Sequence, residues 1–112
     1  ILLLGMAYKK NIEDTRESAS IKIFESLKQE KEIITNYYDP YIKKHRFLIN
    51  KKRVYINGMK NTKNMFKSHD IIVIATDHDK FNYKKILSSR KIIIDLRGRF
   101  RNKKPNKKIF IL

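Results

Sequence analysis

The most regular feature of the sequence is a set of short, nearly continuous apolar runs at residues 1–4, 33–38, 71–75 and 92–94. The runs are rich in Ile, Leu, Val and Tyr, which are favoured in β-strands. They lack the strict alternation of apolar and polar positions that marks a strand with one solvated face. Continuous apolar runs are typical of strands that helices cover on both sides. The pattern therefore predicts a buried parallel sheet.

Residues 18–31 follow a different pattern, with apolar side chains spaced for one face of a helix. The stripe is formed by Ile21, Ile23, Phe24 and Leu27. Lys, Glu and Gln occupy the opposite face, so an amphipathic helix is predicted here. Ser18 is a suitable N-cap, since its hydroxyl can accept a hydrogen bond from a free N–H of the first turn.

Two shorter helices are predicted further along, at residues 61–68 and 83–88. Their expected buried side chains are Met65, Phe66, Ile86 and Leu87. Strands and helices then alternate along the whole chain, which favours parallel βαβ connections. The prediction is an α/β fold, a Rossmann-like three-layer sandwich whose mostly parallel sheet carries helices on both faces. It forms one domain over residues 1–112.

The remaining segments give weaker signals. Residues 54–56 fit a short strand, and Asn57 with Gly58 is a turn signal. The basic stretch 99–108, which contains Pro105, is expected to cross the surface before a last strand at residues 109–112.

Cysteine and histidine limit the chemistry that the chain can perform. The sequence has no Cys, which excludes disulfides, zinc–thiolate sites and a thiol nucleophile. Its three His are scattered, so we expect isolated surface side chains and no metal site. The cluster of Asp77, His78 and Asp79 is interpreted as structural, with Thr76 and Asp77 capping the strand end and starting the next helical region.

The start of the chain and its apolar segments bear on whether it is part of a longer protein and in which compartment it lies. The chain begins inside an apolar run without Met, which indicates a piece of a longer protein. Charged residues interrupt every apolar segment, so no membrane span is expected. A cytoplasmic protein is the prediction.

The strong positive charge allows two interpretations. There are 27 Lys and Arg against 11 Asp and Glu, a formal net charge of +16. Such a surplus can bind nucleic acid. The basic residues are, however, spread over the whole chain, are mostly Lys and accompany no nucleic-acid-binding motif. We therefore favour a compositional origin, with a basic nucleic-acid-binding α/β domain as the alternative. In either case the field attracts anionic ligands.

The first strand-to-helix junction is the best generic candidate for an anion site. Ligands of open parallel sheets bind beyond the carboxyl ends of the strands. Gly5 permits a sharp turn there, and the following helix start offers free N–H groups and a positive dipole end. Lys9 and Arg16 add positive charge. The junction matches neither G-x-G-x-x-G nor G-x-x-x-x-G-K-[ST], so it is not a standard dinucleotide or P-loop site.

Read in full, residues 5–18 are GMAYKKNIEDTRES. This string resembles the G-x-A-[FY]-K-x-x-x-x-D-x-R-x-S signature of the UDP-glucose/GDP-mannose dehydrogenase family, where it opens the C-terminal UDP-binding domain. Three further strings are similar to family motifs in the same order. They are YDPY at residues 38–41, VIATDHDKF at residues 73–81 and IDLR at residues 94–97.

The resemblance implies roles for individual residues. Tyr8 and Lys9 fall on the aromatic and Lys that contact the nucleotide sugar, with Tyr8 expected to offer backbone groups and a flat apolar surface. Arg97 falls on the Arg of D-x-R and would also bind substrate; a surface Arg paired with Asp95 or Asp39 is its alternative. Arg16 would reach the phosphates of NAD, and Asp95 would organise its loop.

The resemblance also implies the reaction of the parent enzyme. An NAD-dependent dehydrogenase oxidises the C6 alcohol of a UDP-sugar to a carboxylate, for polysaccharide precursors, through a Cys thiohemiacetal and thioester. That Cys and the main NAD site belong to the family's N-terminal and central domains, so this chain has no catalytic residue of its own. The expected partners are a UDP-sugar, the rest of its own chain and a second subunit in a homodimer.

The sequence leaves alternatives for the identity of the UDP-sugar and for whether the chain acts as part of an enzyme. Tyr at position 8 favours a UDP-N-acetylhexosamine, with UDP-glucose as the other candidate. A free-standing UDP-binding fragment is a second possibility. A receiver domain is disfavoured, because its acidic cluster after the first strand is replaced here by Lys9 and Lys10.

Overall fold

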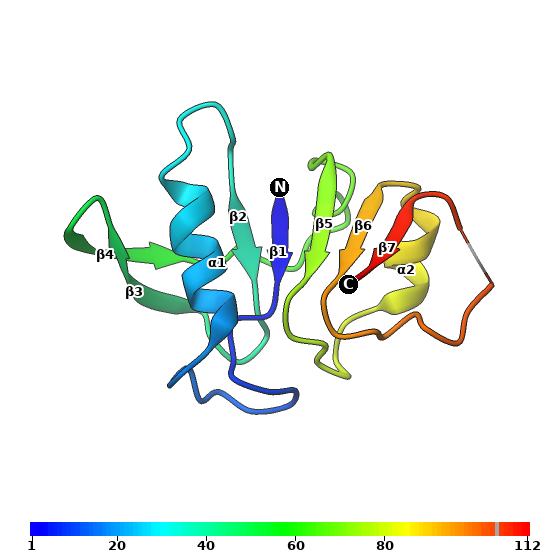
Figure 1. Cartoon of the computed structure of the whole chain (residues 1–112), viewed down its shortest axis with the longest axis horizontal. Helices are drawn as coiled ribbons and strands as arrows, with labels where there is room; N and C mark the ends of the chain where they lie inside the picture. Colours follow the sequence, from blue (N-terminus) through cyan, green and yellow to red (C-terminus); the bar gives the residue numbers. More distant parts are fainter. Residues whose placement is uncertain (105) are drawn as a thin grey trace.

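A computed structural model describes residues 1–104 and 106–112. The elements in chain order are β1 (Leu2–Leu4), α1 (Ala19–Lys28), β2 (Asn36–Tyr38), β3 (Lys44–Ile49), β4 (Lys52–Asn57), β5 (Ile71–Ile74), α2 (Tyr83–Ser88), β6 (Ile92–Asp95) and β7 (Ile109–Ile111). Five strands form one sheet in the order β2-β1-β5-β6-β7 (Figure 1). All of their pairings are parallel. All carboxyl ends therefore meet at one edge of the sheet, the lower edge in Figure 1.

The sheet is covered on both faces, as predicted. Along β1, Leu3 belongs to a core cluster that includes Phe24 of α1. Leu2 and Leu4 belong to a second cluster that includes Ile86 of α2. Successive side chains of a strand point to opposite faces, so the two clusters are the two sides of one sheet. The Rossmann-like three-layer prediction is confirmed.

Helix α1 is shorter than the predicted 18–31 and ends at Lys28. Phe24 is fully buried and anchors the apolar stripe, with Ile21, Ile23 and Leu27 partly buried around it. Ile33 and Ile34, predicted as the start of the second strand, are 37% and 80% exposed, and β2 begins only at Asn36. The predicted strand is too long because the apolar composition continues through Ile33 and Ile34, whereas pairing with β1 begins only at Asn36.

The short strand predicted at residues 54–56 forms as part of β4. The sequence reading missed its partner β3, and the hairpin of the two strands lies beside α1 (Figure 1). Its two-residue turn is Asn50-Lys51, with φ of 51° and 67°. Both values are those of a type I′ turn, but Lys stands where Gly usually signals one. Phe47 of β3 packs on Phe24, with ring centroids 4.5 Å apart, and fixes the hairpin against α1.

The predicted helix at residues 61–68 is wrong. The segment is a series of turns, although Met65 and Phe66 are buried as expected. Asn61, Thr62, Asn64 and Ser68 are poor helix formers, because their side chains compete for nearby backbone groups, as Ser68 Oγ does by donating to the Met65 carbonyl oxygen at 3.1 Å.

The C-terminal half otherwise follows the prediction. Helix α2 spans the predicted residues 83–88, and Asn82 caps it by accepting a hydrogen bond from the Lys85 N–H at 3.1 Å. Thr76 and Asp77, predicted to start this helical region, do not cap it. Strand β7 forms at the predicted position, whereas Pro105 of the basic stretch lies outside the described residues. Within the described residues, every helix is too short or too polar to cross a bilayer.

Candidate functional site

The loop between β1 and α1 begins with a glycine that no other residue can replace without strain. Gly5 has φ of 92°. A Cβ at this position would lie 2.4 Å from both Cβ and the carbonyl oxygen of Thr76, just beyond β5. The chain therefore leaves β1 in close contact with the end of the neighbouring strand, and the loop is directed over the carboxyl edge of the sheet.

Side chains from other segments hold the next residues of this loop in place. Thr76 Oγ1 donates to the Ala7 carbonyl oxygen at 2.7 Å and is itself 3.0 Å from Ser20 Oγ of α1. The Tyr8 N–H donates to the Asp14 carbonyl oxygen at 2.7 Å, which closes the loop on itself. The segment that carries Tyr8 and Lys9 is thus fixed by Thr76, which Ser20 of α1 supports, and by a hydrogen bond within the loop.

A hollow of about 530 Å³ lies beside this segment at the carboxyl edge. It is bounded by the opening loop, the start of α1 and the ends of β5 and β6. Its lining residues are Tyr8, Lys9, Glu17, Ala19, Ser20, Ile23, Ala75, Leu96 and Arg97. This is the place where an open parallel sheet binds its ligand.

Arg97 spans the hollow between β5 and the opening loop. Its Nε donates to the Ala75 carbonyl oxygen at 2.7 Å, and its Nη2 donates to the Tyr8 carbonyl oxygen at 3.2 Å. Both acceptors are neutral, so the guanidinium keeps its full charge at the hollow. The alternative in which Arg97 pairs its side chain with Asp95 or Asp39 does not occur.

Asp95 organises the loop after β6, as the sequence reading expected. Its Oδ1 accepts from the backbone N–H groups of Arg97 and Gly98 at 3.1 and 2.9 Å. Its Oδ2 accepts from the Phe100 N–H at 2.8 Å. The carboxylate is fully buried and uses both oxygens, which leaves it no role in acid–base chemistry.

Tyr8 and Lys9 present side chains, not backbone groups, to the hollow. Tyr8 is 50% exposed. Its N–H and carbonyl are already bound to Asp14 and Arg97, which differs from the expectation that its backbone would be offered to a ligand. Lys9 is exposed and enters none of the ion pairs formed by the described residues. Its ammonium is therefore available to an anion.

The start of α1 adds a third positive element. Ser18 is the N-cap, as predicted, but its hydroxyl makes no hydrogen bond to the helix. It donates instead to the Met6 carbonyl oxygen at 2.7 Å. The first turn of α1, which contributes Ala19 and Ser20 to the hollow, thus has no side-chain cap on its N–H groups. Such a helix end carries partial positive charge.

Arg16 lies apart from this group. Its side chain is 88% exposed and binds Asp14 through two hydrogen bonds, Nε to Oδ1 at 3.1 Å and Nη2 to Oδ2 at 2.9 Å. The hydrogen bonds from Arg16 lower the pKa of Asp14 to about 2. The structure therefore brings Tyr8, Lys9 and Arg97 together and leaves Arg16 outside the hollow.

Comparison with known proteins identifies this arrangement. A profile of the UDP-glucose/GDP-mannose dehydrogenase family, UDP binding domain, matches residues 2–102. The chain belongs to this family. The match covers all four motifs, so the resemblance seen in the sequence is confirmed.

The curated relatives that match this UDP-binding domain are UDP-N-acetyl-D-mannosamine dehydrogenases. The protein from Pyrococcus horikoshii is 37% identical over 104 residues, which are 88% of this chain and 21% of that protein. The protein from Methanococcus vannielii is 33% identical over 81 residues, 72% of this chain and 16% of that protein. The chain thus spans about a fifth of the length of the curated relatives that it matches.

Solved structures match the whole fold of the UDP-binding domain. UDP-D-ManNAc dehydrogenase from Pyrococcus horikoshii aligns with a TM-score of 0.64 and 30% identity, over 98% of this chain and 24% of that one. The UDP-N-acetyl-mannosamine dehydrogenase Cap5O from S. aureus aligns with the same TM-score and 22% identity, over 98% and 25%. The second likeness is evidence of the fold alone.

The prediction that all three histidines lie on the surface of the UDP-binding domain is wrong. His69 and His78 are buried, with 6% and 0% exposed, and only His45 is partly open. Ring nitrogens that find hydrogen-bond partners allow a neutral imidazole to enter a core. Lone histidines without periodic spacing gave no sign of these partners, which come from distant segments.

Other residues of the hollow also escaped notice. Glu17, Ser20 and Leu96 line it beside the predicted residues. Glu17 has φ of 56°, an uncommon value for a residue with a side chain. Its place inside the first signature, between Arg16 and Ser18, was the available signal.

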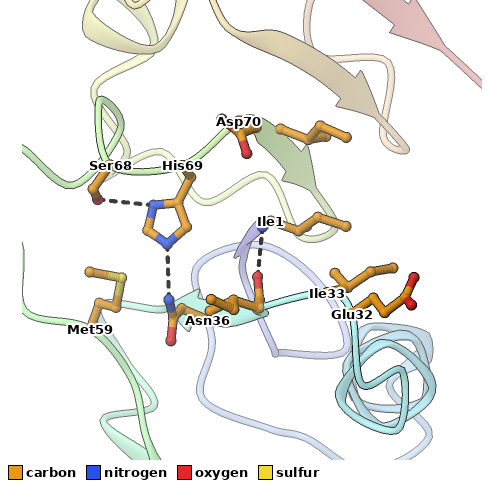
Figure 2. A pocket seen from close by; sticks show the side chains of 10 residues that line it. Ile1, Glu32, Ile33, Asn36, Met59, Ser68, His69 and Asp70 are labelled. Carbon is orange, nitrogen blue, oxygen red and sulfur yellow. Dashed lines mark hydrogen bonds between the residues drawn. The ribbon is translucent and has the colours of Figure 1, made fainter.

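A second hollow of similar size, about 530 Å³, lies at the opposite edge of the sheet (Figure 2). It is lined around Ile1, Asn36 and His69, where the strands begin. Its lining includes the carboxylates of Glu32 and Asp70, which disfavour an anion, and it holds none of the residues of the family motifs. The hollow at Lys9 and Arg97 is therefore the candidate site.

Proposed function

We propose that this chain is the UDP-sugar-binding, C-terminal domain of an NAD-dependent UDP-sugar 6-dehydrogenase, and that the hollow receives the UDP part of the substrate. The observation that carries the proposal is the convergence of Lys9, Arg97 and the uncapped start of α1 on one hollow. The domain spans residues 1–112, with N-terminal NAD-binding and central helical domains in the parent enzyme.

Lys9, Arg97 and Glu17 are the charged residues that line the hollow, and two cations against one carboxylate suit a diphosphate. Lys9 supplies a mobile ammonium, while Arg97 supplies a guanidinium that two carbonyl groups hold in place. Hydrogen bonds between charged partners are shorter and about twice as strong as neutral ones. The net charge of +16 adds a field that raises the rate of encounter with an anion.

The substrate class follows from the relatives and from Tyr8. The relatives carry the name UDP-N-acetyl-D-mannosamine dehydrogenase, so a UDP-N-acetylhexosamine is the proposed substrate, with UDP-glucose as the alternative. Tyr8 exposes half of its side chain at the hollow and can pack its ring against the nucleotide.

The oxidation itself depends on residues outside this chain. The sequence has no Cys, so the nucleophile of the proposed reaction, which converts a C6 alcohol to a carboxylate, must come from another domain. NAD, bound mainly by the N-terminal domain, would accept the hydrides. Arg16 fits a contact with its phosphates, because the side chain is exposed and Asp14 engages only Nε and Nη2. A cytoplasmic homodimer completes the proposal.

Calorimetric titration with UDP tests the binding role. Lys9→Ala should weaken UDP binding about 5- to 20-fold, the equivalent of one charge-assisted hydrogen bond of about 1–2 kcal/mol. Lys10→Ala is the matched control, since Lys10 is also exposed but does not line the hollow. Uridine, which lacks the diphosphate, should bind weakly to both variants and to the unchanged protein.

A parallel titration with duplex DNA over a salt series tests the nucleic-acid alternative. The proposal expects UDP binding that depends on Lys9, with at most weak DNA binding that disappears as salt rises. Tight DNA binding together with no measurable UDP binding would replace the proposed function with the alternative.

A further inference from the structure

Two fully buried side chains lie beneath the opening loop and take no direct part in the hollow. Asp39 follows β2 and His78 follows β5, and the exposed fraction of both side chains is 0%. His78 Nε2 is 2.9 Å from Asp39 Oδ2. Neither residue lines the hollow at Lys9 and Arg97. Burying a carboxylate and an imidazole costs free energy unless both are fully hydrogen-bonded. Their presence in the core therefore suggests a role for the pair.

The hydrogen bonds fix the direction of this contact. The backbone N–H of Asn11 donates to His78 Nδ1 at 2.8 Å, so Nδ1 acts as an acceptor and carries no proton. The proton is then on Nε2, which donates to Asp39. The imidazole is a two-ended connector between the carboxylate and the far side of the opening loop.

Asp39 holds the near side of the same loop. Its Oδ2 also accepts from the backbone N–H of Met6 at 2.7 Å, and its Oδ1 accepts from the Tyr41 N–H at 2.8 Å. The loop is therefore anchored at Met6 through Asp39 and at Asn11 through His78. Tyr8 and Lys9 lie between the two anchors.

A further contact strengthens the second anchor. The Asn11 side chain donates to Asp79 Oδ2 at 2.7 Å and accepts from the Asp79 N–H at 2.9 Å. Asn11 has φ of 65°, a left-handed conformation that Asn tolerates better than most residues. The loop thus turns at the residue that His78 and Asp79 grip.

We propose that the buried Asp39–His78 pair is a positioning device, which sets the Tyr8–Lys9 segment in the conformation that receives the diphosphate. This inference rests on the proposed function of the hollow. It assigns a physical role to two motif residues that do not line the hollow, Asp39 of YDPY and His78 of VIATDHDKF. The pair acts through Met6 and Asn11 and does not contact the ligand.

The chain offers a matched control for the loss of a buried histidine. His69 is also buried and bonded at both nitrogens, to the Met65 carbonyl oxygen at 2.7 Å and to Asn36 Nδ2 at 3.0 Å. Figure 2 shows its bond to Asn36, the first residue of β2, so His69 lies where the strands begin and not at the carboxyl edge that carries the opening loop. A change at His69 removes a comparable set of hydrogen bonds without touching the opening loop.

The test compares His78→Gln with His69→Gln at a temperature where both variants are folded. Gln at position 78 can still donate to Asp39 from near the Nε2 position, but it has no acceptor at the Nδ1 position for the Asn11 N–H. We expect UDP affinity to fall about tenfold in His78→Gln and to stay within about twofold in His69→Gln. His78→Asn, whose side-chain oxygen can lie near the Nδ1 position, should recover part of the loss.

Amide hydrogen exchange of the free protein supplies a readout that does not need UDP. The Tyr8 N–H, which is bonded to Asp14, should exchange faster in His78→Gln and not in His69→Gln, while the amides of β1 and β5 keep their protection. Faster exchange throughout the sheet would mean a general loss of stability and would overturn the positioning role.

The outcomes separate the two proposals. If the unchanged protein fails to bind UDP, the proposed function is wrong, and the exchange rate of Tyr8 alone decides whether the pair orders the loop. If UDP binds but His78→Gln binds it as tightly as the unchanged protein, the positioning proposal is wrong and the function stands.

Discussion

Arg97 donates from Nη2 to the carbonyl oxygen of Tyr8 at 3.2 Å, although the two residues are 89 positions apart in the sequence. The bond joins the loop after β6 to the loop after β1, across the end of β5. It makes one guanidinium both a support for the Tyr8 segment and a cation at the hollow. Two predicted site residues therefore depend on each other.

Arg97→Lys keeps the charge but removes the Nε and Nη2 geometry. We expect UDP affinity to fall about tenfold, because an ammonium cannot hold both carbonyl groups and also bind a phosphate. Arg53→Lys, at an exposed position on β4, is the control and should change affinity less than about twofold. Equal affinity of Arg97→Lys and the unchanged protein, measured by calorimetry, would remove Arg97 from the site.

The Arg16–Asp14 pair predicts a defined response to pH. Hydrogen bonds from Arg16 depress the pKa of Asp14 from 3.8 to about 2. A depressed folded-state pKa means that the contact stabilises the protein above the ordinary pKa and is lost as the pH falls towards about 2. A carbon-detected NMR titration should place the Asp14 midpoint near 2, and nearer 3.8 in Arg16→Gln. Arg99→Gln should leave the Asp14 midpoint unchanged. An Asp14 midpoint that is the same in Arg16→Gln and in the unchanged protein would contradict the ion pair.

Two glycines with positive φ should differ sharply in their tolerance of Ala. At Gly5 a Cβ would meet Thr76 backbone and Cβ atoms at 2.4 to 2.8 Å, whereas at Gly98 the nearest atoms belong to the flexible end of Arg101. Gly98→Ala should cost about 1–2 kcal/mol for the left-handed backbone. Gly5→Ala should cost more than about 3 kcal/mol or prevent folding. Urea denaturation measures the free energy of unfolding of both variants. Similar losses of stability would mean that the backbone around Gly5 and Thr76 can shift to make room for a Cβ.

Phe24 should be a main determinant of stability. It is fully buried and packs against Tyr37 at 5.4 Å and Phe47 at 4.5 Å between ring centroids. Phe24→Ala should destabilise the protein by about 3–5 kcal/mol, whereas Tyr55→Ala, on the exposed face of β4, should change it by less than about 0.5 kcal/mol. Chemical denaturation measures both, and a small loss at Phe24 would mean that the hairpin does not depend on this contact.

The sheet could be predicted from the sequence because strands buried on both faces are continuous apolar runs. Residues 71–75 and 92–94 contain no polar side chain; β5 lies within the first run, and β6 covers the second and ends one residue later at Asp95. Helix α2 was equally clear. The β3–β4 hairpin was not, because Lys44, His45 and Arg46 in succession hide the alternation of β3, and its turn, Asn50-Lys51, lacks the usual Gly.

The site could be predicted only in part, for a related reason. Tyr8, Lys9 and Arg97 occupy loops at strand ends, where both topology and the family motifs direct attention. The support beneath them depends on contacts such as Asn11 with His78, between residues 67 positions apart. No local spacing encodes such a contact, so the sequence reading placed His78 on the surface.

The most direct test of the account is a crystal structure of the protein with UDP. We predict that the diphosphate lies in the hollow, within hydrogen-bond distance of Lys9 Nζ and the Arg97 guanidinium and near the first turn of α1. UDP bound elsewhere on the surface, with Lys9 and Arg97 facing solvent, would contradict it.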